Sequence, residues 1–249
     1  MMRILALALL LCGLSGGAAR ADSDVLWHFI HDRCVPGVAA GSGPAPCALV
    51  AYPQGAASGY VVFKDRTGAA QYLVMPVAKI TGIEDPAILA TDATNYFAAA
   101  WQARGYFLAK IGRELPRNAI SLAVNSPGGR SQNQLHIHID CIDPQVRAAL
   151  AARQDSLGSV WAPLGVPLMG HSYRALRVES PDLEGVNPFK LLAADVGADG
   201  MKRHRLAAVG AHFADGRDGF ILLDDSAGST PGDYASSEEL QDHDCKLAK

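Results

Sequence analysis

The stretch Leu135-His136-Ile137-His138-Ile139-Asp140-Cys141 alternates strictly between apolar and polar side chains. Successive side chains of a β-strand point to opposite faces of the sheet, so this period of two predicts a strand with one face in the core. The other face carries His136, His138 and Asp140. Two imidazoles and a carboxylate within mutual reach can act as nucleophile, orienting base and proton handler, so these three are candidate catalytic residues.

A polar loop precedes this strand. It contains Asn125, two glycines and the run Gln132-Asn133-Gln134. Their amides are neutral hydrogen-bond donors of the kind that suit phosphate oxygens. The loop therefore favours a phosphate-handling site over a solvated strand face that merely holds two histidines. Asn125, Gln132 and Asn133 are the candidate phosphate-binding residues.

The elements around this strand predict an α+β fold. A β-hairpin is expected around a turn at residues 65–68, followed by Asp85 as the N-cap of one long or two short helices. The order hairpin, helix, strand, loop, strand is typical of an antiparallel sheet with helices packed on one face. The expected strands are residues 59–64, 70–75, 120–124 and 135–142.

The second half of the chain carries weaker signals of the same kind. Its hairpin resembles the first one in pattern, so residues 145–249 are a candidate decayed copy that packs on the first half as a partner subunit would. No second histidine motif accompanies it. We expect residues 22–249 to form a single domain with its catalytic core at about 59–142. Further expected elements are helices at 24–33, 145–154 and 188–194 and strands at 173–178, 207–213 and 220–224.

Residues 1–21 predict an export signal. Arg3 gives a positive start, residues 4–14 are apolar, and Ala19-Arg20-Ala21 fits a small-residue cleavage site. The apolar run is too short to span a bilayer comfortably, so a cleaved signal is favoured and a short membrane anchor is the alternative. The protein is therefore expected to be exported, and to be periplasmic or associated with the inner membrane.

The charge balance excludes a nucleic-acid partner, because the formal net charge is −3 and no basic stripe is present.

Four cysteines follow the export segment, and an even number in an exported protein indicates disulfides. Three pairings are open. We prefer Cys34–Cys47, which closes a loop rich in Gly and Pro, with Cys141–Cys245 attaching the C-terminal tail to the central strand. Buried free thiols are the alternative.

The stretch from Asn125 to Asp140 resembles the histidine-triad (HIT) signature, in which an Asn, a glycine loop and a Gln precede His-x-His-x-His. The spacing to His136 matches without a gap. Upstream, Tyr72-Leu-Val-Met-Pro76 and the following Lys79 are similar to the family's strand and its turn with Pro and Lys.

More narrowly, three stretches resemble the bacterial CDP-diacylglycerol pyrophosphatases. They are the histidine motif, Asn187-Pro-Phe-Lys and the tail Glu238-Glu-Leu-Gln-Asp-His243.

The resemblance implies a HIT-like fold and the cleavage of a liponucleotide, CDP-diacylglycerol, to CMP and phosphatidic acid at a membrane surface, without cofactor or metal. It implies that His138 forms a nucleotidyl intermediate and that His136 supports it. Asp140 departs from the signature, because it stands where the third histidine is usual. The donor of the leaving-group proton therefore stays open. The implied phosphate-binding residues are Asn125, Gln132, Asn133 and Lys79.

Two other functions are alternatives. His136, His138 and Asp140 could hold a metal in a metal-dependent phosphoesterase, although that interpretation leaves the amide run unexplained. The second alternative is a non-catalytic exported module that binds a nucleotide or a lipid. The sequence does not decide between a liponucleotide and a soluble dinucleotide substrate, or the oligomeric state. We expect the later histidines to be surface or capping residues; they are His171, His204, His212 and His243.

Overall fold

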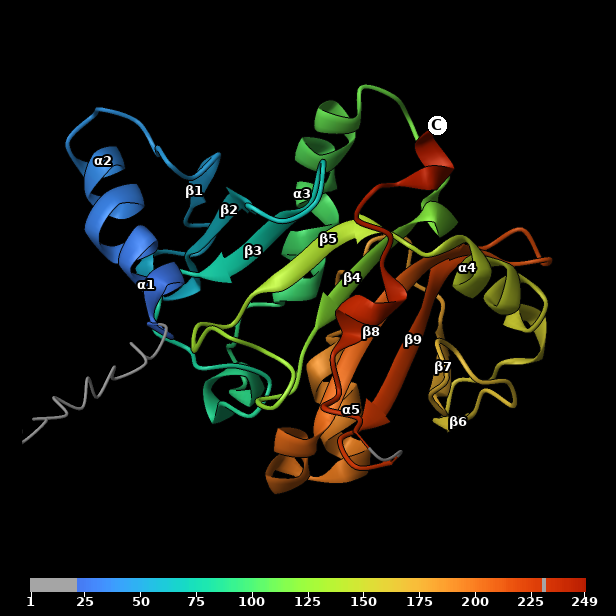
Figure 1. The fold of residues 1–249 in the computed structure, drawn as a ribbon. Helices are drawn as coiled ribbons and strands as arrows, with labels where there is room; N and C mark the ends of the chain where they lie inside the picture. The colour runs from blue at the N-terminus through green and yellow to red at the C-terminus, as the bar shows by residue number, and fades with distance from the viewer. Residues whose placement is uncertain (1–21, 230–231) are drawn as a thin grey trace, which may run out of the picture.

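The computed structural model describes residues 22–229 and 232–249 (Figure 1), and the expected export segment lies outside them. Nine strands in these residues form one antiparallel sheet in the order β1-β2-β3-β5-β4-β8-β9-β7-β6. This confirms the α+β class. The strands are β1 Leu49–Ala51, β2 Tyr60–Lys64, β3 Tyr72–Pro76, β4 Ile120–Val124, β5 Ile137–Cys141, β6 Ala162–Pro163, β7 Arg174–Val178, β8 His204–His212 and β9 Asp218–Ser226.

The α-helices α3 Tyr96–Ile111, α4 Pro144–Ala151 and α5 Pro188–Val196 begin at polar N-caps that the sequence supplies. Asn95 accepts a hydrogen bond from the Ala98 amide at the start of the longest helix, which ends at Gly112 with φ of 78°. Asp85 is an N-cap as expected, but of a separate short 3₁₀ turn, Pro86–Leu89. The other α-helices are α1 Val25–Phe29 and α2 Val35–Ala39.

Two parts of the fold differ from the sequence prediction. A π-helical turn, Ile30–Cys34, joins α1 to α2, so the N-terminal helix continues to Ala39 where a loop was expected. Pro36 lies in the first turn of α2, where a missing amide hydrogen is tolerated. The edge strands β1 and β6 were not predicted, because segments of three and two residues are too short to show a period of two. No helix among the described residues is long and apolar enough to cross a membrane.

The two halves of the sheet share one strand order. In the first half, β2, β3, β4 and β5 lie in the sheet as β2-β3-β5-β4, with α3 between the second and third strands in the chain. In the second half, β6, β7, β8 and β9 lie as β6-β7-β9-β8, with α5 in the corresponding place. The third strand of each half, β4 and β8, pair at the centre. This common order supports the interpretation of the second half as a decayed copy.

Helices cover both faces of the sheet. The face covered by α3 and α5 contains the largest apolar core, which includes Phe97, Trp101 and Phe189. This is the arrangement expected from the sequence. However, α4 lies on the opposite face, where Val146 and Leu150 pack against β8 and β9.

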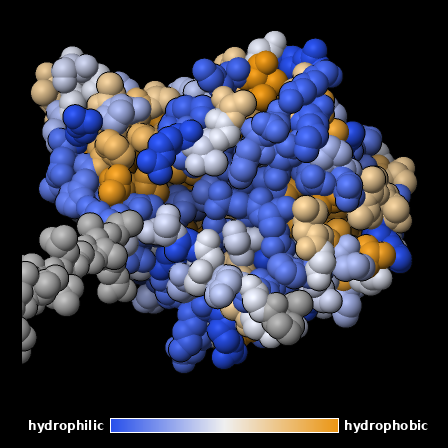
Figure 2. Space-filling model, viewed as in Figure 1, coloured by the Kyte–Doolittle hydropathy of each residue, from blue (hydrophilic) through white to orange (hydrophobic). Residues whose placement is uncertain are grey.

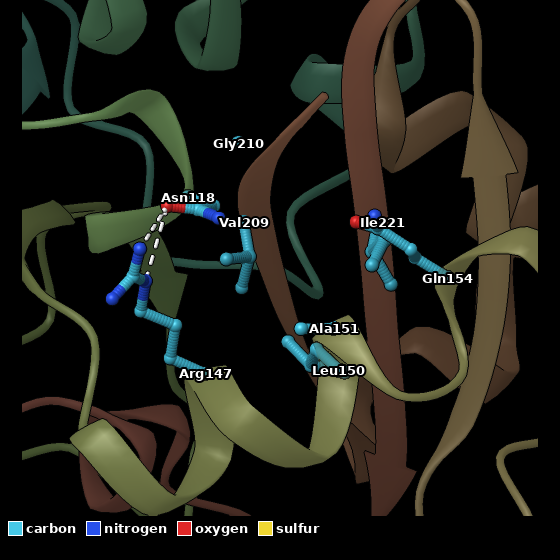
Figure 3. A pocket seen from close by; sticks show the side chains of 8 residues that line it. All are labelled: Asn118, Arg147, Leu150, Ala151, Gln154, Val209, Gly210 and Ile221. Carbon is cyan, nitrogen blue, oxygen red and sulfur yellow. Dashed lines mark hydrogen bonds between the residues drawn. The ribbon is translucent and has the colours of Figure 1, made fainter. Parts of the chain in front are cut away.

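Figure 3 shows the close contact of α4 with the rest of the chain. Arg147 donates from Nε and Nη2 to Asn118 Oδ1 at 3.0 and 2.9 Å. Leu150 and Ala151 lie beside Val209 and Ile221 of the sheet. The space left between them is about 10 Å³, which is too small for a ligand.

Both predicted disulfides are present, Cys34–Cys47 and Cys141–Cys245. The second joins the C-terminal tail to the end of β5. Next to it, the Asp242 amide donates to the Cys141 carbonyl at 2.9 Å. In Figure 1 the tail, in red, crosses the sheet on the face opposite α3.

A fully buried arginine on β8 also holds the tail. Arg205 Nη2 lies 2.6 Å from Asp225 Oδ2 and 3.2 Å from Asp233 Oδ2, and Nη1 donates to the Ser236 carbonyl at 3.1 Å. Glu239 lies 3.0 Å from Nη1. These carboxylates also accept hydrogen bonds from their surroundings, such as the Ala235 amide to Asp233, but Arg205 is the cation that contacts all three.

Replacing this arginine should therefore destabilise the fold. We expect Arg205→Met to lower the free energy of unfolding by about 3–5 kcal/mol, because it leaves buried carboxylates without the guanidinium that compensates their charge. Urea unfolding followed by circular dichroism measures the loss. Arg217→Met is the matched control, since Arg217 pairs with Asp215 on the surface, where ion pairs contribute little. Equal losses in the two variants would contradict this account of the tail.

Candidate active site

The two faces of β5 have different roles, as the alternation predicts. Ile137 and Ile139 belong to the core under α3. His136, His138 and Asp140 lie on the other face and are also buried, with only 8, 4 and 0% of their surface exposed. The neighbouring strands β3 and β4 flank His138 on both sides. The three candidate catalytic residues are thus fixed in the middle of the sheet.

The tautomer of His136 follows from its hydrogen bond. Its Nδ1 lies 2.6 Å from the carbonyl oxygen of Gln134. A carbonyl oxygen can only accept a hydrogen bond, so Nδ1 carries the hydrogen and Nε2 of the neutral ring has an unprotonated lone pair. The ring packs edge-on against His138, with centroids 4.9 Å apart. Burial lowers the pKa of His136, which keeps it neutral near pH 7.

His138 is a buried imidazole that lacks a hydrogen bond within the described part of the chain, at either ring nitrogen. Glu238 Oε1 lies 3.3 Å from its Nε2. Burial, and then the adjacent His136, hold the pKa of His138 well below its usual value. A neutral ring with an available lone pair is what nucleophilic chemistry requires.

Asn125, at the end of β4, connects this site to the tail. Its Nδ2 donates to Glu238 Oε1 at 2.6 Å, and its Oδ1 accepts from the Ser237 amide at 2.7 Å. Asn125 is therefore near His138 as expected, but its amide holds a protein carboxylate. Glu238 is a residue of the site whose place sequence reasoning missed, because 113 positions separate it from Asn125.

A cavity of about 790 Å³ opens onto the histidine pair. Figure 2 shows the hollow at the left of the view, where apolar side chains gather beside α1 and hydrophilic side chains continue toward the centre. The cavity thus has an apolar and a polar part. Its apolar lining is Val25, Leu26, Phe29, Phe63 and Leu73, and its polar lining includes Lys64, Asp65, Arg66, Asn125, Arg130, Gln132, His136, His138 and Glu238.

Gln132 lines the cavity and also braces the N-terminal segment. Its Oε1 accepts from the Leu26 amide at 3.1 Å, and its Nε2 donates to the Asp22 carbonyl at 3.1 Å. One wall of the cavity is therefore made by the first described residues of the chain.

Asn133 and Lys79 bind the same segment instead of facing the histidines. Asn133 Nδ2 donates to Ser23 Oγ at 3.2 Å, and Lys79 Nζ lies 2.8 Å from Asp24 Oδ2. Neither residue lines the cavity. In this structure their polar groups therefore contact the N-terminal segment, and their assignment to phosphate stays a prediction.

Two cations of the cavity were not singled out from the sequence. Lys64, at the end of β2, donates to the Asp65 and Gly68 carbonyls at 2.6 and 3.2 Å, and burial lowers its pKa. Arg130 forms a two-point contact with Glu84, at 2.8 and 2.5 Å. Both bring cationic groups to a cavity that also contains the carboxylates of Asp65 and Glu238, and among the described residues Lys64 has no carboxylate hydrogen-bonded to its ammonium.

Asp140 turns away from the two histidines. Its Oδ1 accepts from the Cys141 amide at 2.8 Å, and its Oδ2 lies 2.7 Å from His243 Nδ1. His243 was expected to be a surface or capping residue. It is instead a partner of a buried carboxylate, with 35% of its side chain exposed.

This geometry does not favour the metal alternative. In the described part of the chain, one group of three side chains has the spacing of a metal site, namely His171, Asp225 and Asp233. The guanidinium of Arg205 already contacts both carboxylates of that group. His136, His138 and Asp140 do not form such a group.

The sequence model of the CDP-diacylglycerol pyrophosphatase family matches residues 21–249 of the chain. A protein of Yersinia pestis that carries the name CDP-diacylglycerol pyrophosphatase is 41% identical over 249 residues. The similarity covers 99% of this chain and 93% of that relative.

The burial of His138 generates a pH prediction. We expect its ring to stay neutral when the pH is lowered from 8 to 6, whereas an unfolded histidine takes up a proton near pH 6.5. Because the unfolded state then binds more protons, this residue makes folding less favourable as the pH falls below 6.5. Nitrogen-15 NMR of the histidine side chains tests it. A His138 titration midpoint at or above 6.5 would contradict the predicted direction.

Proposed function

The chain belongs to the CDP-diacylglycerol pyrophosphatase family and is a hydrolase of CDP-diacylglycerol, and we propose that it acts through a covalent intermediate on His138. The observation that carries this proposal is the buried ring of His138, which faces a cavity and has no hydrogen bond to the described residues. A ring held in this way by its neighbours is free to form a bond to phosphorus.

The reaction then has two steps. In the first, a ring nitrogen of His138 forms a bond to the phosphorus next to cytidine, the bond from that phosphorus to the bridging oxygen breaks, and phosphatidic acid leaves. In the second, water attacks the same phosphorus, the nitrogen–phosphorus bond breaks, and CMP is released. Dividing one difficult displacement into two easier ones is the advantage of a covalent route.

The other residues of the cavity have supporting roles in this proposal. His136 packs against the nucleophile and has a free Nε2. Lys64 and Arg130 bring positive charge to the place where the diphosphate must lie. Gln132 lines the same cavity, and Asn125 positions Glu238 beside His138. Of these groups, the two cations can stabilise the phosphoryl oxygens during both steps.

We also propose that the protein acts after export, at a membrane surface. Disulfides persist in oxidising compartments, and the two disulfides are consistent with export. Asp22, the first described residue, lines the cavity and directly follows the predicted export segment in the sequence. The apolar part of the cavity suits the uncharged portions of a liponucleotide.

The nucleophile is tested by substitution. We expect His138→Asn to lower kcat for CMP release from CDP-diacylglycerol in detergent micelles by roughly 10⁴-fold or more, because only binding and electrostatic groups remain. Mass spectrometry of wild-type protein quenched during turnover should find CMP attached to the peptide that contains His138, in an acid-labile linkage.

His212→Asn is the control for this variant, since His212 is an exposed histidine outside the cavity. Its activity should equal that of the wild type. Wild-type turnover in a folded His138→Asn protein would rule out the covalent route, while substrate binding without CMP release by the wild type would indicate a binding module.

A matched pair of lysines tests which cations meet the substrate. Lys64→Gln should raise KM for CDP-diacylglycerol by about tenfold or more, because a charge-assisted contact to phosphate contributes on the order of 1.5–3 kcal/mol. Lys79→Gln should change KM little, since Lys79 pairs with Asp24 outside the cavity. Steady-state kinetics measures both. A larger increase of KM in Lys79→Gln than in Lys64→Gln would support the phosphate-binding role that the sequence predicts for Lys79.

A further inference from the structure

The C-terminal tail delivers an imidazole to the histidine face of β5. His243 Nδ1 lies 2.7 Å from Oδ2 of Asp140, a carboxylate with no exposed surface. A carboxylate accepts, so Nδ1 donates the hydrogen and Nε2 of His243 is left to exchange protons with another group. An acid of this kind, oriented by a buried aspartate, is a common arrangement for proton transfer.

His243 also lies against the turn that forms the rim of the cavity. The Ala69 amide donates to the His243 carbonyl at 3.1 Å. A Cβ placed on Gly68 would lie 3.3 Å from the His243 Cβ. Residues Asp65 and Thr67 of the same turn line the cavity that contains His138. The imidazole therefore sits beside the lining of the cavity, where the tail, the β2–β3 turn and β5 meet, and it is close enough to His138 for its charge to act on that ring.

The surroundings of His243 favour its protonated form. The hydrogen bond with Asp140 is the main cause that raises its pKa above the usual 6.5, and burial acts in the opposite direction. Burial also raises the pKa of Asp140, while the contact with His243 acts to lower it, so the contact favours the imidazolium–carboxylate form of the pair. The titratable groups around the imidazole are Asp140, Lys64, Asp65, His138, Glu238 and Asp242.

Anchoring the tail does not require this pair. The Cys141–Cys245 disulfide lies on one side of His243, and the Arg205 contacts lie on the other. Gln241 adds a hydrogen bond to Ser121 Oγ at 3.0 Å. A buried aspartate that faces a histidine is a costly way to add one more contact, so a role in proton transfer gives a better account of it.

We propose that His243, held by Asp140, is the acid and base of the reaction, and that the tail thereby supplies the imidazole that β5 itself lacks at its third polar position. This inference rests on the proposed function. In the first step His243 gives its Nε2 proton to the bridging oxygen as the phosphorus–oxygen bond breaks. In the second step the neutral ring takes a proton from the attacking water, so that each turnover restores the imidazolium.

The experiment compares kcat/KM against pH for the wild type, His243→Asn and Asp140→Asn, with CDP-diacylglycerol in detergent micelles. Asparagine at 243 can still donate to Asp140 but cannot carry a transferable proton. His212→Gln is the control, because His212 forms the same type of pair with Asp218, at 2.8 Å, on an exposed surface. Thermal unfolding of each variant verifies that the fold persists.

The wild-type kcat/KM should fall as the pH rises through the pKa of His243, because the first step needs the imidazolium form of that residue. We expect His243→Asn to lower kcat/KM by about 10²–10⁴-fold and to remove this alkaline fall. Asp140→Asn should move the fall to lower pH, since the group that raises the pKa of His243 is neutralised. The control should keep the wild-type rate and profile.

The inference is overturned if folded His243→Asn keeps a rate within threefold of the wild type, or if it loses rate but retains the alkaline fall unchanged. That second result would mean a purely structural pair. Trapping of CMP on His138 of the wild type separates the two proposals: a trapped adduct with an unaltered His243→Asn profile rejects only this inference, whereas no adduct rejects the covalent route itself.

Discussion

Removal of His138 from water is the interaction on which the site depends. The ring lies on a central strand between β3 and β4, and the tail closes the same face of the sheet. Burial without a hydrogen bond is costly for a polar side chain, and here it has a chemical consequence, because it disfavours the charged imidazolium and leaves the lone pair available. The effect at His243 is the opposite. There the contact with the buried carboxylate of Asp140 outweighs burial and favours a proton on the ring.

The second half of the sheet supports the site without repeating its chemistry. It has the strand order of the first half, but the face of β9 corresponding to the histidine face carries Ile221 and Leu223, which pack under α4. The space that could hold a second site is therefore filled with apolar side chains. What the second half provides is the tail, which begins beyond β9 and returns across β8 and β4 to bring Glu238 and His243 to the first half.

Stability and activity are therefore coupled through the tail. Arg205 and its buried carboxylates hold one end of this segment, and the Cys141–Cys245 disulfide holds the other. Between them, Asn125 fixes Glu238 next to the nucleophile. A substitution that loosens either end should disturb residues of the cavity far away in the sequence, because Glu238 and His243 lie on the segment between these two ends.

The sequence by itself determined the α+β class, the central strand and the family resemblance, because a period of two, turn residues and an unbroken histidine motif are local signals. It indicated disulfides and favoured the observed pairing, but it left all three pairings open. It placed Asn125 and Gln132 at the cavity, but it also assigned Asn133 and Lys79 to phosphate, since a polar side chain in the correct stretch does not reveal which way it points. It treated His243 as a surface residue. Only the tertiary structure decided the pairing of His243 with Asp140 across 103 positions, because that contact depends on the path of the tail over the sheet.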